Sequence, residues 1–295
     1  MLAQYQEWSI GIYVGTSPYD FVPAPQAVNP VLTRWDVSDV PATFVADPFM
    51  LKTEHTWYMF FEVMNGATRQ GEIGLATSHN GMQWHYRQIV LREPFHLSYP
   101  HVFAWQGDYY MIPESCQAGA VRLYQAVDFP WRWTCRTTLL TGSYMVDASP
   151  FHYADRWWLF VETSPAFRHD TLRLYCADAL TGPWREHPLS PVIKGDARSA
   201  RPAGRVTVNK NRVIRYTQDC SPIYGTQVRA FDICTLTTTA YDEREHRSAA
   251  VLSDSGTGWN ASGMHHIDPW PLPDGTWLAC VDGFCWSAAS QTPSL

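Results

Sequence analysis

The stretch ADPFMLKTEHTWYMFFE, residues 46–62, places an aspartate and a proline before a short apolar segment, a polar turn and an aromatic segment. Two apolar segments around a polar turn predict a β-hairpin. Asp47 stands at the front of a segment otherwise built for burial. Because a buried, unpaired carboxylate is costly, Asp47 must either have a structural partner or be retained for chemistry.

The same pattern returns four times along the chain. The copies are YPHVFAWQGDYYMIPE (99–114), VDASPFHYADRWWLFVE (146–162), RPAGRVTVNKNRVIRYTQ (201–218) and HHIDPWPLPDGTWLACVDG (265–283). A second recurrent strand lies between them: GEIGLATS (71–78), VRLYQAVD (121–128), LRLYCADA (172–179) and TQVRAFDI (226–233). Repeats of about 50 residues with about four strands each are typical of a β-propeller. A β-sandwich, the competing all-β fold, predicts no such period.

We therefore expect an all-β, five-bladed β-propeller formed by residues 1–295 as a single domain. The expected blades lie near 44–95, 96–142, 143–195, 196–255 and 260–285, the last completed by 8–15. The segment WSIGIYVG (8–15) has no hairpin partner of its own. Pairing it with WLACVDG (277–283) closes the ring and removes an exposed sheet edge.

Composition narrows the possible partners. Hydrophobic residues make up 45% of the chain and aromatic residues 14%, which suits a large core and also surfaces that stack on sugars. The net charge of −6 argues against nucleic acid and anionic lipid as partners. No transmembrane segment or signal sequence is evident. The seven cysteines are scattered without a C-x-x-C pair, which favours reduced thiols and a cytoplasmic location.

The candidate site follows from the repeat. The first strand of each blade lines the axis of a propeller, so residues at one point of each repeat converge there. If the repeats are aligned on their polar residues, steps of 54, 46, 54 and 64 residues relate the converging set. It consists of Asp47, His101, Asp147, Arg201 and one or both of His265 and His266. Five polar positions at five equivalent points indicate a binding or catalytic site.

The adjacent histidines His265 and His266 bear on the question of a metal. On a regular strand they point to opposite faces, so they are poorly placed to hold one ion together. A hydrogen-bonded histidine is therefore favoured over a metal ligand. We assign no metal ligands and no certain cofactor, and a divalent cation at the propeller axis stays an alternative.

Other candidates lie near the same points of the repeats. Glu114, in MIPES, ends a second strand at the sheet rim, and Glu62 and Glu162 end two others, where they could cap the strands by hydrogen bonds. In GDARSARPAGR, the residues Arg198, Arg201 and Arg205 could clamp a phosphate or form a solvated turn. Gln218 and Tyr224 add hydrogen-bonding side chains.

On these residues the chain resembles the N-terminal domain of plant glucosamine inositolphosphorylceramide transferases and stand-alone bacterial relatives. More distantly it resembles the five-bladed propellers of family 43 glycoside hydrolases. The motifs include ADPF, GEIGLATS, HLSYPHVF, YMIPES, LTGPWREHPLSPV, ARPAGR, YTQDC and GMHHID, which cover the chain from about Trp8 to Gly283.

The hydrolase resemblance implies roles for single residues. It makes Asp47 the general base and Asp147 the residue that orients the general acid and tunes its pKa. Where that acid, a glutamate, should open the next blade, this chain has Arg201. A guanidinium cannot deliver a proton at neutral pH, so the usual pairing of an acid with a base is incomplete.

The arginine favours a glycosyltransferase that uses a phosphate-linked or nucleotide-linked sugar in glycan or glycolipid biosynthesis. Arg201 would stabilise the departing phosphate, and Asp47 would deprotonate a glycan or glycolipid acceptor. His101 and Asp147 would bind sugar hydroxyls or hold Arg201. Three alternatives stay open: a glycosidase with Glu114 as a relocated acid, a non-catalytic glycan-binding propeller, and a phosphorylase whose arginines bind inorganic phosphate.

Overall fold

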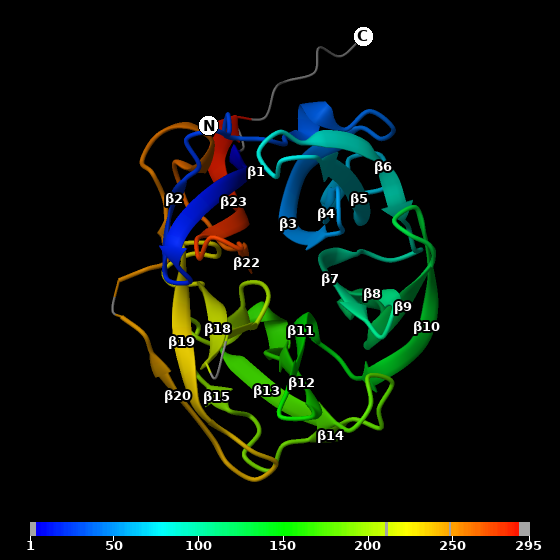
Figure 1. Cartoon of the computed structure of the whole chain (residues 1–295), viewed down its shortest axis with the longest axis vertical. Helices are drawn as coiled ribbons and strands as arrows, with labels where there is room; N and C mark the ends of the chain where they lie inside the picture. The colour runs from blue at the N-terminus through cyan, green and yellow to red at the C-terminus, as the bar shows by residue number, and fades with distance from the viewer. Residues whose placement is uncertain (1–3, 210–211, 248, 289–295) are drawn as a thin grey trace.

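Five antiparallel sheets surround a central axis in the computed structural model, which describes residues 4–209, 212–247 and 249–288 (Figure 1). Each sheet is one blade, and its first strand lies nearest the axis. The innermost strands are β3 (Ala42–Lys52), β7 (Ser98–Trp105), β11 (Val146–Tyr153), the short β16 (Arg201–Pro202) with β17 (Thr207–Asn209), and β22 (Ile267–Pro271). The second strands are β4 (Trp57–Asn65), β8 (Asp108–Glu114), β12 (Arg156–Glu162), β18 (Arg212–Asp219) and β23 (Trp277–Ala288).

The outer half of each blade completes the four-stranded pattern. The third strands are β5 (Gln70–Ser78), β9 (Ala120–Asp128), β13 (Thr171–Ala177), β19 (Gln227–Leu236) and β1 (Gln4–Ser17). The fourth strands are β6 (His85–Leu91), β10 (Arg132–Thr141), β14 (Arg185–Glu186) with β15 (Ile193–Lys194), β20 (Tyr241–Glu245) with β21 (Leu252–Ser253), and β2 (Asp20–Pro23). The fold is all-β and a five-bladed propeller, which confirms the fold predicted from the repeat.

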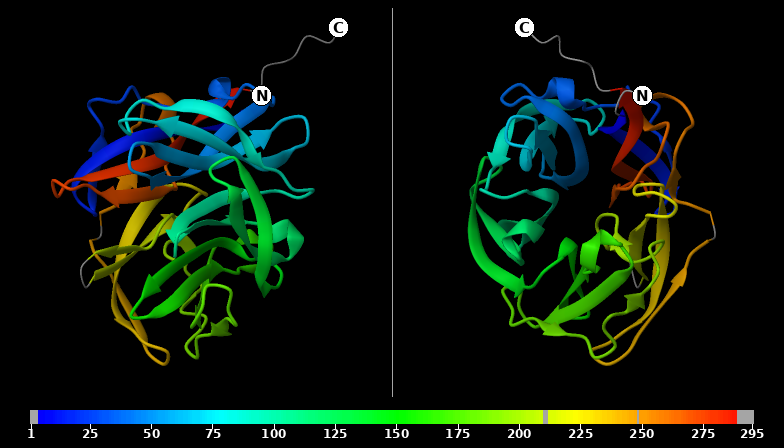
Figure 2. Two further views of the ribbon diagram at one scale, coloured as in Figure 1. Left: turned by 45° about the vertical axis from the view of Figure 1, so that its right-hand side comes forward. Right: turned by 180° about the vertical axis from the view of Figure 1, so that it is seen from behind.

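The N-terminal strand closes the ring. β1 pairs antiparallel with β23 from Gln4 opposite Ala288 to Gly15 opposite Trp277. The two strands, blue and red, lie side by side in both views of Figure 2. The predicted closure is confirmed, and the fifth blade gains a strand that the sequence did not suggest, because β2 pairs with the far edge of β1.

The hydrophobic core lies between neighbouring blades. One cluster joins Phe60 and Leu75 of the first blade to Val102 and Tyr124 of the second. The aromatic strands therefore serve first as packing surfaces, since burying one large apolar side chain stabilises the fold by about 1.5–3 kcal/mol.

Two side chains tie the blades together across the axis. The Tyr99 hydroxyl of the second blade accepts a hydrogen bond from Gly204 N at 2.7 Å, donates to Gly204 O at 2.9 Å and lies 2.8 Å from Ser149 Oγ. Arg205 of the fourth blade bonds Asp268 of the fifth at 2.7 Å.

Among the described residues, the helical content is limited to four 3-10 turns of three residues each. They are η1 (Arg34–Asp36), η2 (Cys116–Ala118), η3 (Pro165–Phe167) and η4 (Gly258–Asn260). Within the part of the chain that the structure describes, no helix has the length and apolar character needed to cross a membrane.

Candidate active site

A repeated β-bulge turns polar side chains toward the axis. In the first three blades two consecutive residues leave the ladder between the first and second strands. The first residue of each pair is left-handed: Asp47 has φ 52°, Tyr99 φ 46° and Asp147 φ 49°. Non-glycine residues seldom adopt this backbone, and such strain clusters at functional sites. A bulge re-aims the side chain, which explains how two carboxylates of buried strands point into the axis.

The bulge also corrects the alignment of the second blade. His101 was predicted to be equivalent to Asp47, but that position is held by Tyr99, two residues earlier. His101 instead pairs with Ile112 and packs its ring 4.8 Å from that of Phe49. Burial, with Arg205 nearby, places the pKa of His101 well below its usual value. His101 is therefore neutral, and its ring is buried beside Phe49.

Arg201 and Asp147 form a buried ion pair between neighbouring blades. The Nε of Arg201 lies 2.5 Å from Oδ2 of Asp147, which also accepts a hydrogen bond from Gln218 at 3.0 Å. Arg201 donates from NH1 to Nδ1 of His169 at 3.0 Å, and its guanidinium lies 5.0 Å from the ring centre of Tyr224. Burial, aided by Arg201, lowers the pKa of His169 to about 4. The sequence analysis named four of these five residues as site candidates, placed only Asp147 and Arg201 in the converging set, and missed His169.

Asp47 lies beside both histidines of the fifth blade. Its Oδ1 is 3.8 Å from Nε2 of His265 and 3.6 Å from Nδ1 of His266, and has no hydrogen-bond partner among the described residues. Residues 264–266 are not part of a regular strand, so the expectation that the two histidines point to opposite faces was wrong. Burial raises the pKa of Asp47 to about 7, although the charge of His265 opposes the shift.

Asp282, which the sequence analysis did not single out, anchors this group. Its Oδ1 accepts a hydrogen bond from Nδ1 of His265 at 2.7 Å, and its Oδ2 accepts one from the Asp47 backbone at 2.9 Å. Burial lowers the pKa of His265, but the Asp282 carboxylate outweighs it and the net direction is upward. The preference for a hydrogen-bonded histidine fits this geometry. Asp47, His265 and Asp282 also offer three ligand atoms within 4.8 Å of one another.

The second strands add a ring of polar groups just behind the first. Glu62, Glu114, Glu162 and Gln218 stand opposite the residues that precede the bulges or open β16. Part of their role is capping, as predicted: Glu162 accepts from Ser164 N at 2.6 Å. Asp282 is the corresponding residue of the fifth blade and lies within β23.

Burial favours the protonated form of several of these carboxyls. Burial raises the pKa of Glu114 to about 7, that of Glu62 well above its usual value and that of Glu162 by a smaller amount. The remaining charges are paired, Asp147 with Arg201 and Asp282 with His265. Ion pairing and the raised carboxyl pKa values both reduce the negative charge of the site, which suits a ligand rich in hydroxyl groups.

The other two arginines are placed differently from Arg201. Arg205 is held by Asp268 and by the carbonyls of Met50 at 3.1 Å and Val102 at 2.9 Å, which makes it a structural tie among four blades. Arg198 is exposed near the rim, with its Nε 3.7 Å from Asp219 Oδ2. Of the three, Arg201 alone lies in the cluster with Asp147.

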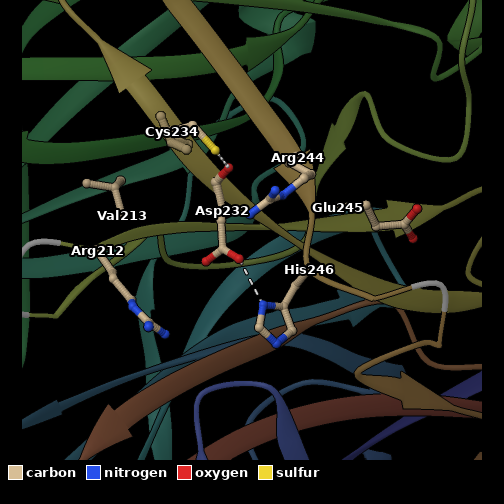
Figure 3. A pocket seen from close by; sticks show the side chains of 8 residues that line it. Arg212, Val213, Asp232, Cys234, Arg244, Glu245 and His246 are labelled. Carbon is tan, nitrogen blue, oxygen red and sulfur yellow. Dashed lines mark hydrogen bonds and ion pairs between the residues drawn. The ribbon is translucent and has the colours of Figure 1, made fainter.

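A cavity of about 600 Å³ lies away from the axis beside β18, β19 and β20 (Figure 3). Its charges offset one another: Asp232 Oδ2 lies 2.8 Å from Nδ1 of His246, and Glu245 lies 2.7 Å from NH1 of Arg229. Because its acids are already paired, this cavity is a weaker candidate than the axis, where Oδ1 of Asp47 and Oδ1 of Asp147 are buried without a partner among the described residues.

Comparison with known proteins identifies relatives over nearly the whole chain. The model of the family "Glucosamine inositolphosphorylceramide transferase 1, N-terminal" matches residues 3–284. A glucosamine inositolphosphorylceramide transferase 1 from japonica rice is 35% identical over 298 residues, covering 94% of this chain and 40% of the rice protein. The Arabidopsis thaliana protein of the same name is 33% identical over 296 residues, covering 94% of this chain and 39% of that protein. The chain thus spans about two fifths of the length of these relatives.

Solved structures share the fold at low sequence identity. The β-1,2-mannobiose phosphorylase of Listeria innocua superposes with a TM-score of 0.66 at 11% identity, covering 92% of this chain and 96% of that one. The catalytic domain of a Coprinopsis cinerea family 62 α-L-arabinofuranosidase gives a TM-score of 0.61 at 11% identity, covering 96% and 99%. At such identities the likeness establishes the propeller alone.

Proposed function

The chain belongs to the family of glucosamine inositolphosphorylceramide transferase N-terminal domains, and on that premise we propose that its axial site transfers a sugar from a phosphate-activated donor to a hydroxyl acceptor. The observation that carries the proposal is the Arg201–Asp147 pair, which fixes a guanidinium beside Asp47 in the cluster. The relatives' name supports an amino sugar such as glucosamine as the group transferred and an inositol phosphate glycolipid as the acceptor.

In this proposal Arg201 stabilises the leaving group. Its Nε and NH1 are held by Asp147 and His169, while no hydrogen bond to NH2 is found among the described residues. A preorganised guanidinium can stabilise the negative charge that develops on a departing phosphate. Because burial favours the protonated form of Glu62, Glu114 and Glu162, these carboxyls repel an approaching anion less than ionised groups would.

Asp47 serves as the general base. In the transfer step, the acceptor oxygen bonds to the anomeric carbon while the bond from that carbon to the phosphate oxygen breaks. The electron pair leaves with the phosphate at Arg201, and the acceptor proton passes to Asp47. A carboxyl whose pKa lies near 7 is well matched to proton transfer at neutral pH.

Glycoside hydrolysis is the second candidate, favoured by Glu114. Burial and the nearby Asp147 charge raise its pKa to about 7, so a large fraction is protonated at neutral pH and could act as a general acid. In this scheme Glu114 donates a proton to the leaving oxygen while Asp47 activates water. A protonated carboxyl at this place distinguishes the scheme from phosphate-based transfer.

A divalent cation at Asp47, His265 and Asp282 is a further proposal. The donor set of two carboxylates and one imidazole fits such an ion, and Asp47 Oδ1 is a buried atom without a partner among the described residues. A bound cation would supply positive charge for sugar hydroxyls. Stabilisation by Ca²⁺ or Mn²⁺ that is lost in Asp47→Asn would support it.

Ligand-dependent melting separates the two main candidates. Nucleoside diphosphates or nucleotide sugars should raise the Tm if the site binds an activated donor, and Arg201→Gln should remove this effect. Arg198→Ala, at an exposed position, is the control for a general loss of positive charge. Stabilisation by free mono- or oligosaccharides alone, or a nucleotide effect that survives Arg201→Gln, would contradict the role of Arg201 and favour hydrolysis or binding.

A further inference from the structure

An open cavity of about 590 Å³ adjoins the axial cluster between the second and third blades, and Glu114 belongs to both. His96, Ser143, Tyr144 and Phe167 also line it. The cavity is large enough for a monosaccharide and open to solvent, so a molecule bound there could reach the axial residues through Glu114.

One wall of this pocket is aromatic and exposed. The rings of Tyr144 and Phe167 are 38% and 54% exposed, and they meet edge to face with centroids 5.5 Å apart. Large aromatic groups held in solvent at a cavity mark a contact surface more often than a packing need. Two rings set at 82° to each other form an angled platform suited to the C–H face of a pyranose ring.

Both aromatic residues have a strained backbone conformation. Tyr144 has φ 57° and Phe167 φ 51°, in the left-handed region that aromatic residues rarely adopt. In η3 the strained Phe167 lies two residues before His169, which accepts the hydrogen bond from Arg201. Strain kept in a surface loop that also contacts the axial arginine points to a functional contact.

The opposite wall is polar and linked to the axial carboxyls. Among the described residues Glu114 makes only long hydrogen bonds, 3.3 Å from Cys116 N and 3.4 Å from Ser98 Oγ, so it retains capacity to accept or donate. His96 accepts from Gly71 N at 2.9 Å and directs its other nitrogen to Glu62 at 3.4 Å. A sugar on the aromatic wall would therefore turn its hydroxyls toward the axis.

We propose that this pocket is a saccharide subsite for the acceptor, in which a neutral pyranose ring stacks on Tyr144 and Phe167 and hydrogen-bonds Glu114. The assignment to the acceptor, rather than to the donor, rests on the proposed transfer function, which places the donor phosphate at Arg201. The pocket itself follows from the two rings, their strained backbone and the shared carboxyl.

Saturation-transfer NMR titrations with cellobiose, lactose, maltose and N,N′-diacetylchitobiose, in the absence of nucleotide, test this subsite. At least one disaccharide should bind the whole chain, and Tyr144→Ala and Phe167→Ala should each weaken it about tenfold. Tyr144→Phe, which keeps the ring, should retain affinity. Trp35→Ala removes a more exposed aromatic ring outside the pocket and should change nothing.

The outcomes separate this inference from the proposed function. If no disaccharide binds, or if binding survives both alanine variants, the subsite is overturned whatever the result with nucleotides. If the alanine variants lose the disaccharide while the Tm shift with nucleotides persists, both proposals are supported. If the alanine variants lose disaccharide binding and nucleotides do not change the Tm of the native chain, the subsite is supported and phosphate-based transfer is contradicted.

Discussion

Arg201 and Asp147 lie 54 positions apart and in different blades, yet the guanidinium Nε approaches the carboxylate Oδ2 to 2.5 Å, with side chains 10% and 1% exposed. The pair joins the third and fourth blades and leaves Asp147 Oδ1 without a partner among the described residues. One interaction thus both joins two neighbouring blades and shapes the electrostatics of the site.

Replacing one partner of this ion pair should lower the free energy of unfolding more than replacing both partners. Arg201→Gln leaves Asp147 as a buried carboxylate without its cation, which should lower the free energy of unfolding by about 3 kcal/mol. The double variant Asp147→Asn/Arg201→Gln leaves no unpaired charge and should recover more than half of that loss. Chemical denaturation of the three proteins measures both. A double variant less stable than the single one would contradict the pairing.

Asp47 should make the fold less stable as the pH rises. Its pKa is about 7 in the folded state against 3.8 for an ordinary aspartate, so its stabilising contribution is complete below about pH 4 and is lost as the pH rises through 7. Asp47→Asn removes this dependence. Its Tm relative to the native chain should therefore rise by about 4 °C or more between pH 5 and pH 8. A constant difference across this range would show that Asp47 is ionised throughout.

A substitution at Gly204 tests how closely the fourth and fifth blades approach each other. Its φ is 133°, and a Cβ there would lie 1.8 Å from the Ile267 carbonyl oxygen. Gly204→Ala should therefore prevent folding. Gly275 also has positive φ, 87°, but nothing lies within 4 Å of its would-be Cβ, so Gly275→Ala should cost only about 1–2 kcal/mol. Equal Tm values for the two variants would contradict the contact.

The Tyr99 hydroxyl should contribute measurably to stability. Tyr99→Phe leaves the buried Gly204 N–H without its acceptor, which should cost about 1–3 kcal/mol. Tyr58→Phe is the matched control, because no hydrogen bond to its hydroxyl is found in the described part of the chain. Equal denaturation midpoints for the two variants would argue against the axial tie.

The sequence predicted the ring because its evidence was periodic. Few folds other than a propeller repeat a hairpin about every 50 residues. The segment WSIGIYVG lacked a hairpin partner, and the last blade lacked a strand that this segment could supply. Asp47 and Asp147 were placed at the axis for the same reason. The contacts of Arg201 with His169 could not be predicted in this way, since His169 lies in an irregular loop that no repeat fixes.

The sequence contained signals that could have corrected the alignment of His101 and pointed to Asp282. Pro48 and Pro100 each follow the first bulged residue, so an alignment on proline pairs Asp47 with Tyr99. An alignment on polar residues instead selected His101. Asp282 ends WLACVD as Glu62 ends WYMFFE, and only the structure reveals that this position faces the axis in every blade.

Release of nucleoside diphosphate from a panel of nucleotide sugars, followed from pH 5 to pH 9 with and without a saccharide acceptor, tests the central claim most directly. The account predicts acceptor-dependent release whose kcat/KM rises through about pH 7 as Asp47 ionises, and which is lost in Asp47→Asn and Arg201→Gln but kept in Arg198→Ala. Release that survives both changes, or sugar hydrolysis that declines above pH 7 and depends on Glu114 but not Arg201, would contradict it.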